Sequence, residues 1–266
     1  MTLLADRRMT LSETLRAQGR ILFALMLRDV RTRFFGSAFG ALIAIAWPLS
    51  HVFILLGIYT LLGRAAPYGE NAALFFATGV TPFMAFNYMS RFTSMGIALN
   101  RPLLGFPVVK ITDILFARAI LEVMNAAIVV LATMLIFAIL GIGFMPEDKI
   151  QAFCALGASM LLGLGFGVVN GVIAGIFPLW LTGSVLFTII MWVSSGVLFV
   201  PDALPETAQY WLSFNPMLVG IEWMRSAYYE GYGQGLLFKY YMVSFALVTL
   251  FLGLLLERLL RKRIRE

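Results

Sequence analysis

Six long apolar runs constrain this sequence more than any other feature. Hydrophobic residues fill 61% of its 266 positions and charged residues only 13%, whereas soluble domains hold about 45–50% and about 25%. Because roughly 20 apolar residues cross the hydrocarbon core of a bilayer, such runs predict transmembrane helices. The runs cover residues 39–62, 72–90, 114–140, 152–177, 180–200 and 240–256. The sequence therefore predicts an all-α membrane protein with six transmembrane helices.

An amphipathic stretch precedes the first run. From Thr10 to residue 35, leucines and arginines occupy two faces of one helix, which predicts an interfacial helix. Thr10 and Glu13 have the spacing of a capping box, which would start this helix. We therefore predict a cytoplasmic N-terminus and interfacial helix over residues 1–36, a transmembrane domain over 37–258 and a basic cytoplasmic tail over 259–266.

The basic residues predict the orientation in the membrane. Sixteen of the twenty lie before residue 34, between Arg91 and Arg118, or between Arg258 and Arg265. Cytoplasmic loops carry the excess of lysine and arginine in membrane proteins. Six spans with both termini in the cytoplasm place all three groups on one side. The net charge of +6 therefore indicates a cytoplasmic membrane face and no nucleic-acid partner.

Residues 201–239 are too polar and too rich in proline to span, yet too apolar for an ordinary exposed loop. Asn215-Pro216 predicts the start of a helix that extends to about Tyr228, and residues 204–212 predict a shorter helix before it. Irregular backbone at membrane depth needs protein or a water-filled cavity around it. We therefore predict a re-entrant segment on the outer side that caps a translocation path.

Aromatic side chains are dense in this outer segment. An interfacial belt explains them without a ligand, and flat rings also suit the apolar faces of sugars. Both interpretations remain open. The predicted translocation path or outer gate consists of Tyr210, Trp211, Asn215, Pro216, Trp223 and Tyr228.

Glycines recur every four residues in the fourth run and leave one helix face without side chains, so another backbone can approach closely there. These are Gly163, Gly167, Gly171 and Gly175. The ridge predicts helix packing within the subunit, with a sliding or dimer interface as the alternative. Arg118 and Glu122 have the spacing of an intrahelical ion pair, and His51 predicts a hydrogen-bonded packing role rather than a proton relay.

No enzyme is predicted in this chain. The sequence has no P-loop lysine followed by Ser or Thr, no metal-ligand cluster and no Ser-His-Asp or paired-carboxylate constellation. Its single cysteine, Cys154, excludes a disulfide within the chain. We therefore expect no metal and no cofactor here, and any ATP would be hydrolysed elsewhere.

Three segments resemble the membrane subunits of type-2 ABC exporters, in particular the capsular-polysaccharide branch. The first is RDVRTRFFGS at residues 28–37, continuing to Trp47-Pro48; the second is NRPLLGFP at residues 100–107; the third runs from residue 201 to Arg225. Relatives that export lipopolysaccharide O-antigen tend to carry Lys or Arg where Gly105 stands, so this position favours the capsule branch.

This resemblance implies a homodimer bound to two copies of a cytoplasmic ABC ATPase, which would hold ATP and magnesium. It implies a lipid-linked acidic polysaccharide as substrate, and a periplasmic adaptor and an outer-membrane export protein as partners besides the membrane lipids. In a coupling loop at about residues 97–113, the ATPase would contact Asn100, Arg101, Leu104, Gly105, Phe106 and Pro107. The anionic head group would enter beside Arg28, Arg31, Arg33 and Arg91.

Three other functions compete with this one. The same architecture would serve an exporter of O-antigen, teichoic acid or a hydrophobic small molecule. A proton-coupled secondary transporter should show inverted repeats and buried acidic residues at membrane depth, and neither is evident in the sequence. A structural membrane scaffold would not need the re-entrant outer segment.

Overall fold

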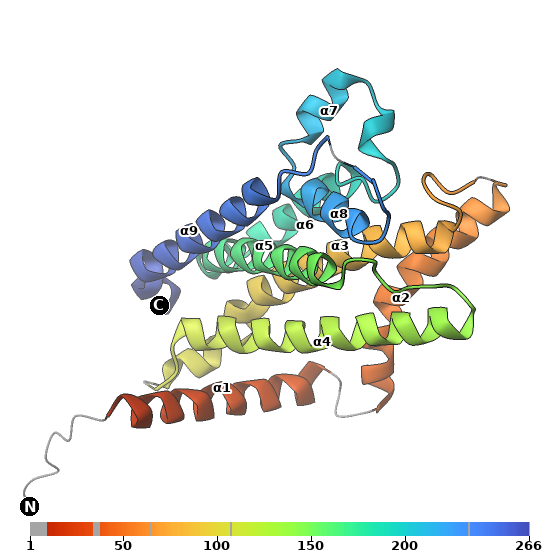
Figure 1. Cartoon of the computed structure of the whole chain (residues 1–266). Coiled ribbons are helices and arrows are strands. Elements are labelled where there is room, and N and C mark those ends of the chain that lie inside the picture. The colour runs from red at the N-terminus through yellow and green to blue at the C-terminus, as the bar shows by residue number, and fades with distance from the viewer. Residues whose placement is uncertain (1–9, 34–37, 64, 107, 234, 266) are drawn as a thin grey trace, which may run out of the picture.

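A computed structural model describes residues 10–33, 38–63, 65–106, 108–233 and 235–265. These residues are helical with no strand among them (Figure 1). The α-helices are α1 Leu11–Arg33, α2 Ala38–Leu61, α3 Ala72–Leu99, α4 Ile111–Ile139, α5 Lys149–Ile176, α6 Trp180–Val193, α7 Glu206–Leu212, α8 Pro216–Ser226 and α9 Lys239–Arg265. Two 3₁₀ helices are η1 Arg101–Gly105 and η2 Pro201–Ala203.

Four helices are long and apolar enough to cross a membrane: Ala72–Leu99, Ile111–Ile139, Lys149–Ile176 and Lys239–Ile264. The other two predicted spans give shorter apolar segments among the described residues, Ala46–Tyr59 and Trp180–Val193. The all-helical membrane class is thus confirmed, with four long apolar helices among the described residues, and the count of six spans stays a prediction. At about 1.5 Å per residue, the 14 residues of α6 extend about 21 Å, less than the roughly 30 Å of the hydrocarbon core.

The fifth predicted span is too long at its end. Helix α6 ends at Val193, whereas the apolar run continues to residue 200. Gly196 adopts a φ of +79°, a left-handed conformation that glycine reaches without steric cost. The hydroxyl of Ser195 also donates to the carbonyl of Trp192. Hydropathy alone does not predict this turn, because the residues that follow it are also apolar.

The second predicted span is too short. Helix α3 continues through Leu99 instead of ending at residue 90, and α4 begins at Ile111. The connection that was expected over residues 97–113 is therefore only residues 100–110, with η1 inside it. At the other end of the chain, α9 runs to Arg265, so residues 259–265 continue the last helix.

Helix α5 lies between α3 and α9 and packs on both through glycines. A Cβ atom at Gly163 would lie 2.5 Å from the carbonyl oxygen of Phe86 on α3, and one at Gly167 would lie 2.6 Å from Cβ of Thr93. On the α9 side, a Cβ at Gly165 would lie 2.9 Å from the amide nitrogen of Leu250. The glycine ridge thus makes backbone contact within one chain.

The rest of that ridge follows the same pattern. A Cβ at Gly171 would lie 3.2 Å from Ser94 on α3, while one at Gly175 would meet side chains of Ile97 and Ile264 at 3.3 Å. Helices α5 and α6 form the expected antiparallel hairpin. Phe166 stacks on Phe187 with centroids 5.6 Å apart, and the hairpin turn lies between them.

Helix α1 begins with the predicted capping box. The Thr10 amide donates to Glu13 Oε2 at 2.8 Å, and the Glu13 amide donates to Thr10 Oγ1 at 3.3 Å. Two hydrogen bonds hold the pKa of the Glu13 carboxyl below its usual value: the larger effect comes from the Thr10 backbone amide and the smaller from the Thr10 hydroxyl. In Figure 1, α1 lies along α4, and Gln18 Nε2 donates to Asp113 Oδ1 of α4.

Candidate functional site

A buried arginine holds the segment of residues 201–239, called the cap segment below. Arg225 of α8 is fully buried. Its Nη1 donates to the carbonyls of Gly196 at 2.8 Å and Phe199 at 3.2 Å, and its Nη2 donates to Val197 at 3.0 Å. Its guanidinium carbon lies 3.8 Å from the ring centroid of Phe75. One side chain therefore ties α8 to the turn after α6 and to α3.

The charge of Arg225 is compensated inside the same cluster. Glu222 Oε1 lies 3.5 Å from Arg225 Nη1, and the hydroxyl of Tyr232 donates to Glu222 Oε1 at 3.0 Å. All three side chains are buried, and a buried charge is tolerated when it is paired and hydrogen-bonded. The cluster therefore fastens the loop after α8 to the same point as the turn after α6.

The predicted helix start at Asn215-Pro216 is confirmed. Asn215 Oδ1 accepts from the Met217 amide at 2.9 Å, as an N-cap does. Its Nδ2 donates to Ser194 Oγ at 2.8 Å and to the Met191 carbonyl at 3.2 Å. One asparagine thus starts α8 and also satisfies the end of α6, where helical carbonyls lack partners. Helix α8 ends at Ser226, earlier than expected.

The aromatic residues assigned to an outer gate divide into two groups. Tyr210 and Trp211 of α7 are 60% and 69% exposed. Trp223 is buried, and its Nε1 donates to Gln151 Oε1 at 2.7 Å. Tyr228 is half-buried and packs beside Phe144. Only the α7 pair lies on the surface of the chain, while the other two aromatic rings pack the cap segment against its neighbours.

The loop between α3 and α4 presents an apolar tip. Asn100 is buried and its Nδ2 donates to the Gly96 carbonyl at 2.8 Å, and Leu104 is also buried. Three large apolar side chains of the loop region are more than half exposed, namely Leu99, Phe106 and Val108; they are called the loop tip below. Arg101 and Gly105 are exposed beside them, and Pro107 lies outside the described residues.

The four arginines predicted to meet an anionic head group do not converge. Arg28, on α1, lies 3.8 Å from Asp29 and lines a groove with Phe92 and Arg118. Arg31 is exposed on the same helix.

Arg91 lines a second groove, between α3, α5 and α6, with a volume of about 480 Å³. The side chain of Arg33 lies outside what the structure describes.

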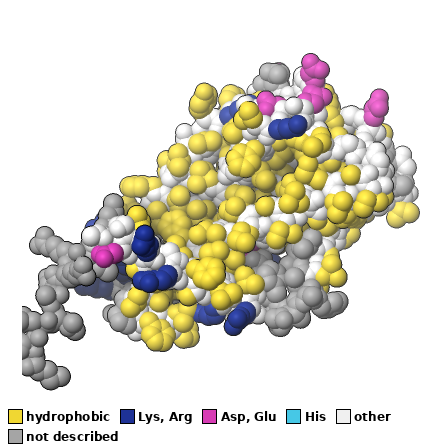
Figure 2. Space-filling view, turned by 60° about the horizontal axis from the view of Figure 1, so that its bottom comes forward, with side chains coloured by type: hydrophobic (Ala, Val, Ile, Leu, Met, Phe, Trp, Pro, Cys, Tyr) yellow, Lys and Arg dark blue, Asp and Glu magenta, His cyan; other side chains and the backbone are white. Residues whose placement is uncertain are grey.

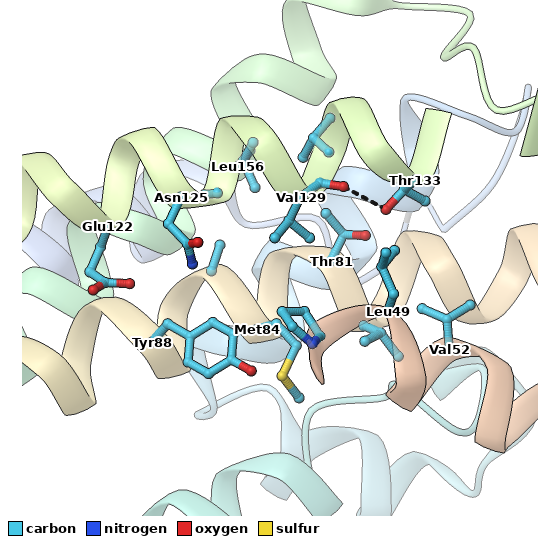
Figure 3. Close-up of a pocket in the computed structure, with 15 residues that line it drawn as sticks. Leu49, Val52, Thr81, Met84, Tyr88, Glu122, Asn125, Val129, Thr133 and Leu156 are labelled. Atoms are coloured by element: carbon cyan, nitrogen blue, oxygen red, sulfur yellow. Dashed lines mark hydrogen bonds between the residues drawn. The ribbon is translucent and has the colours of Figure 1, made fainter. Parts of the chain in front are cut away.

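An internal cavity between α2, α3 and α4 is too small for a sugar. Figure 3 shows Glu122 and Asn125 of α4 facing it, with Tyr88 across from them. The Thr133 hydroxyl, at the same cavity, donates to the Val129 carbonyl at 2.8 Å. The cavity holds about 20 Å³, which is room for about one water molecule. Among the described residues, no group of His, Cys, Asp and Glu is placed to hold a metal ion.

Comparisons with known proteins decide the family. The chain is 31% identical over 237 residues to the polysialic acid transport protein KpsM of Escherichia coli, covering 88% of this chain and 91% of that protein. It is 28% identical over 244 residues to the capsule polysaccharide export inner-membrane protein CtrC of Neisseria meningitidis, covering 91% of both. The chain belongs to the family of capsule polysaccharide export inner-membrane proteins. No general family model matches it.

A third member of this family, BexB of Haemophilus influenzae, is 26% identical over 223 residues, or 83% of each chain. The relationship therefore extends over most of the permease. Together with the apolar helices, it establishes a multi-pass inner-membrane protein. Figure 2 shows the corresponding surface, where a broad apolar band separates two charged ends, one with mostly Lys and Arg side chains and the other with both acidic and basic ones.

Sequence reasoning missed two ionic clusters of the permease. Glu222 and Arg225 have i,i+3 spacing, which was a usable signal for their pairing. Asp29 of α1 had no such signal, because its partner is distant in sequence: Arg118 Nε lies 3.0 Å from Asp29 Oδ2. Arg118 Nη1 also donates to the Phe92 carbonyl at 3.1 Å. The pairing predicted from spacing named only Glu122 as the partner of Arg118.

Replacing Asp29 by asparagine is expected to loosen α1 from α4. Both side chains of the Asp29–Arg118 pair are nearly buried, at 9% and 12% exposure, and breaking such a pair costs about 3 kcal/mol. Limited trypsin digestion of the permease in lipid discs should cleave after Arg28 and Arg31 faster in the variant. Asp29→Glu, which keeps the negative charge and adds no trypsin site, should retain most of the protection. Equal cleavage of all three proteins would contradict this role.

Proposed function

We propose that this permease exports a lipid-linked acidic capsular polysaccharide across the inner membrane, driven by ATP hydrolysis on a separate cytoplasmic ATPase. The relationship to capsule-export proteins over most of the chain carries this proposal. The Escherichia coli relative is named for polysialic acid, which is an acidic polymer. The permease would act as a homodimer with two copies of the ATPase, and pass its cargo to a periplasmic adaptor and an outer-membrane export protein.

In the proposed topology, α2 and α6 complete six spans and both chain termini lie in the cytoplasm. Sixteen of the twenty basic residues fall in the three segments that this topology places in the cytoplasm, which supports the orientation. The buried cluster around Arg225 supports a re-entrant cap segment at the other end, because it satisfies polar groups without solvent. Exposed Tyr210 and Trp211 would then lie at the outer surface, where they could contact the periplasmic adaptor or the sugars of the cargo.

The dimer contact is assigned to α2 and α6. Both helices carry large apolar side chains more than half exposed in the single chain, among them Trp47, Ile54, Leu186 and Ile190. Exposed apolar faces of this extent fit either lipid or a second copy of the chain. A path between two copies would place the groove beside Arg91 next to the cargo.

The coupling step is assigned to the loop tip of Leu99, Phe106 and Val108. An exposed apolar tip next to Arg101 fits the surface that a partner protein buries. Closure of the ATPases on ATP would push on this loop and on α1. Because α3 leads directly into the loop and α4 out of it, the push would move the helices that flank the proposed path.

The substitution Phe106→Glu tests this assignment. Phe106 is 59% exposed, so a charge there should not unfold the permease but should weaken its contact with the ATPase at least roughly tenfold, as loss of a buried aromatic anchor does. The measurement is co-purification of the co-encoded ATPase and its nucleotide hydrolysis. Phe106→Leu is the matched control and should keep most of the binding. Failure of the wild-type permease to recruit an ATPase would overturn the exporter proposal.

Export of O-antigen, teichoic acid or a hydrophobic small molecule would use the same architecture. Deletion of the gene followed by an assay of surface capsule separates these substrates from the proposed one. Export that survives ATP depletion and stops with an uncoupler would instead indicate a proton-coupled transporter.

A further inference from the structure

We infer that the polar groove between α3, α5 and α6 is a binding subsite for an acidic segment of the saccharide chain. This inference rests on the proposed export function and adds a defined contact surface within each subunit. The groove has a volume of about 480 Å³, within the range of roughly 300–1,000 Å³ that small ligands occupy. Its polar residues include Asn87, Arg91, Ser94, Asn170, Ser184 and Thr188.

Two helix faces bring these polar groups together. Asn87, Arg91 and Ser94 are spaced i, i+4 and i+7 on α3, which places them on one face. Ser184 and Thr188 are spaced i and i+4 on α6. Both faces line the same groove. Polar faces on apolar helices are costly in lipid, so their convergence indicates a water-filled or ligand-filled space.

The charge of the groove is positive and uncompensated. No Asp or Glu is found among the described residues that line it. Within the described part of the chain, no side chain pairs with the guanidinium of Arg91, which is exposed. Arg118 lies close by, since its Nη1 donates to the carbonyl of Phe92, the residue next to Arg91. Its charge, unlike that of Arg91, has a partner among the described side chains. Arg118 is paired with Asp29, whereas Arg91 is left for an external anion.

The neutral groups of the groove complement sugar hydroxyls. The Ser94 hydroxyl donates to the Arg91 carbonyl at 2.8 Å, that of Ser184 to Leu181 at 2.7 Å, and that of Thr188 to Ser184 at 2.9 Å. With their hydrogens used in this way, these three oxygens offer only acceptor lone pairs to a ligand. Sugar hydroxyl groups are the donors that such acceptors need.

Asn170 supplies donors with a fixed orientation. Its Oδ1 accepts from the indole Nε1 of Trp180 at 2.9 Å. Because an indole nitrogen only donates, this bond fixes which side of the amide is oxygen. The Nδ2 group of Asn170 then adds neutral donors to the charged donors of Arg91. Donors for a carboxylate or phosphate and acceptors for hydroxyls together match an acidic saccharide better than a neutral one.

A lipid phosphate shares part of this chemistry, so the test separates the two sources. The permease is placed in phosphatidylcholine discs, and binding of an oligogalacturonate is compared with binding of a malto-oligosaccharide of equal length. The acidic probe should bind more tightly. Arg91→Gln should weaken its binding roughly tenfold, the loss expected when a charge-assisted hydrogen bond is removed. Arg91→Lys should weaken it less, because the charge is kept and the planar fork is lost.

Arg263→Gln is the matched control, since it removes an exposed arginine of α9 outside the groove, and it should bind the acidic probe like the wild type. Equal binding of the acidic probe by Arg91→Gln and Arg263→Gln would overturn the inference. So would equal affinity of the wild type for both probes, or loss of acidic-probe binding when phosphatidylglycerol replaces phosphatidylcholine. These outcomes leave recruitment of the ATPase untouched, so they are distinguishable from failure of the exporter proposal.

Discussion

Replacing Arg225 by leucine is expected to destabilise the cap segment more than any other single change in the permease. The substitution leaves the carboxylate of Glu222 buried without its cation, and leaves carbonyls of Gly196, Val197 and Phe199 without their donor. Breaking a buried ion pair alone costs about 3–5 kcal/mol, and each orphaned acceptor adds about 1 kcal/mol or more. We expect a loss of about 4 kcal/mol or more in the free energy of unfolding.

The measurement is unfolding of the permease in detergent or lipid discs, together with protease cleavage within residues 201–239. The double substitution Glu222→Met with Arg225→Leu should recover part of the loss, because it removes the unpaired charge while keeping the volume filled. Glu222→Gln should cost less than Arg225→Leu, since the glutamine oxygen still accepts from Tyr232. A stability of Arg225→Leu within about 1 kcal/mol of the wild type would contradict the role of the cluster.

Gly163→Ala is expected to be strongly destabilising, although it adds a single methyl group. The new Cβ would lie 2.5 Å from the Phe86 carbonyl oxygen and 2.9 Å from Met89 Cβ. Those atoms belong to the backbone and to the first side-chain carbon of α3, so neither can rotate away. Overpacking of this kind costs about 1–3 kcal/mol, and we expect about 3 kcal/mol here.

Gly157→Ala is the matched control on the same helix. No atom lies within 4 Å of a Cβ at that position, and alanine is the better helix former by about 1 kcal/mol. The control should therefore leave the thermal midpoint unchanged or raise it slightly, while Gly163→Ala lowers it. Equal midpoints for the two variants would show that α5 does not lie against α3 as described.

Features that depend on near neighbours in the chain were predictable. The capping box of Thr10 and Glu13 and the N-cap at Asn215 need only residues within one helical turn, and both form as expected. The apolar runs predicted the helices because burial of an apolar face in lipid requires no knowledge of the partner helix. The glycine spacing predicted a close contact without revealing which helix makes it.

Part of the candidate site was predictable in the same limited way. Of the residues assigned to the loop, Arg101, Gly105 and Phe106 are exposed, whereas Asn100 and Leu104 are buried. Of the aromatic residues assigned to the outer gate, Tyr210 and Trp211 are exposed, whereas Trp223 is a buried packing residue bonded to Gln151. Aromatic residues are amphipathic, and one sequence pattern fits both a surface belt and a buried ring whose polar edge finds a partner. Hydropathy could not distinguish an exposed aromatic residue of a surface belt from a buried one.

The amino-acid sequence by itself determined that this protein is a bundle of apolar helices, where most of those helices begin, and which segments are too polar to span. Only the tertiary structure decided that Arg118 pairs with Asp29, that Arg225 binds three carbonyls of another segment, and that Arg91 faces a polar groove with no partner among the described side chains. The reason is physical: helix formation and capping are local, whereas the partner of a charge is set by how distant helices pack.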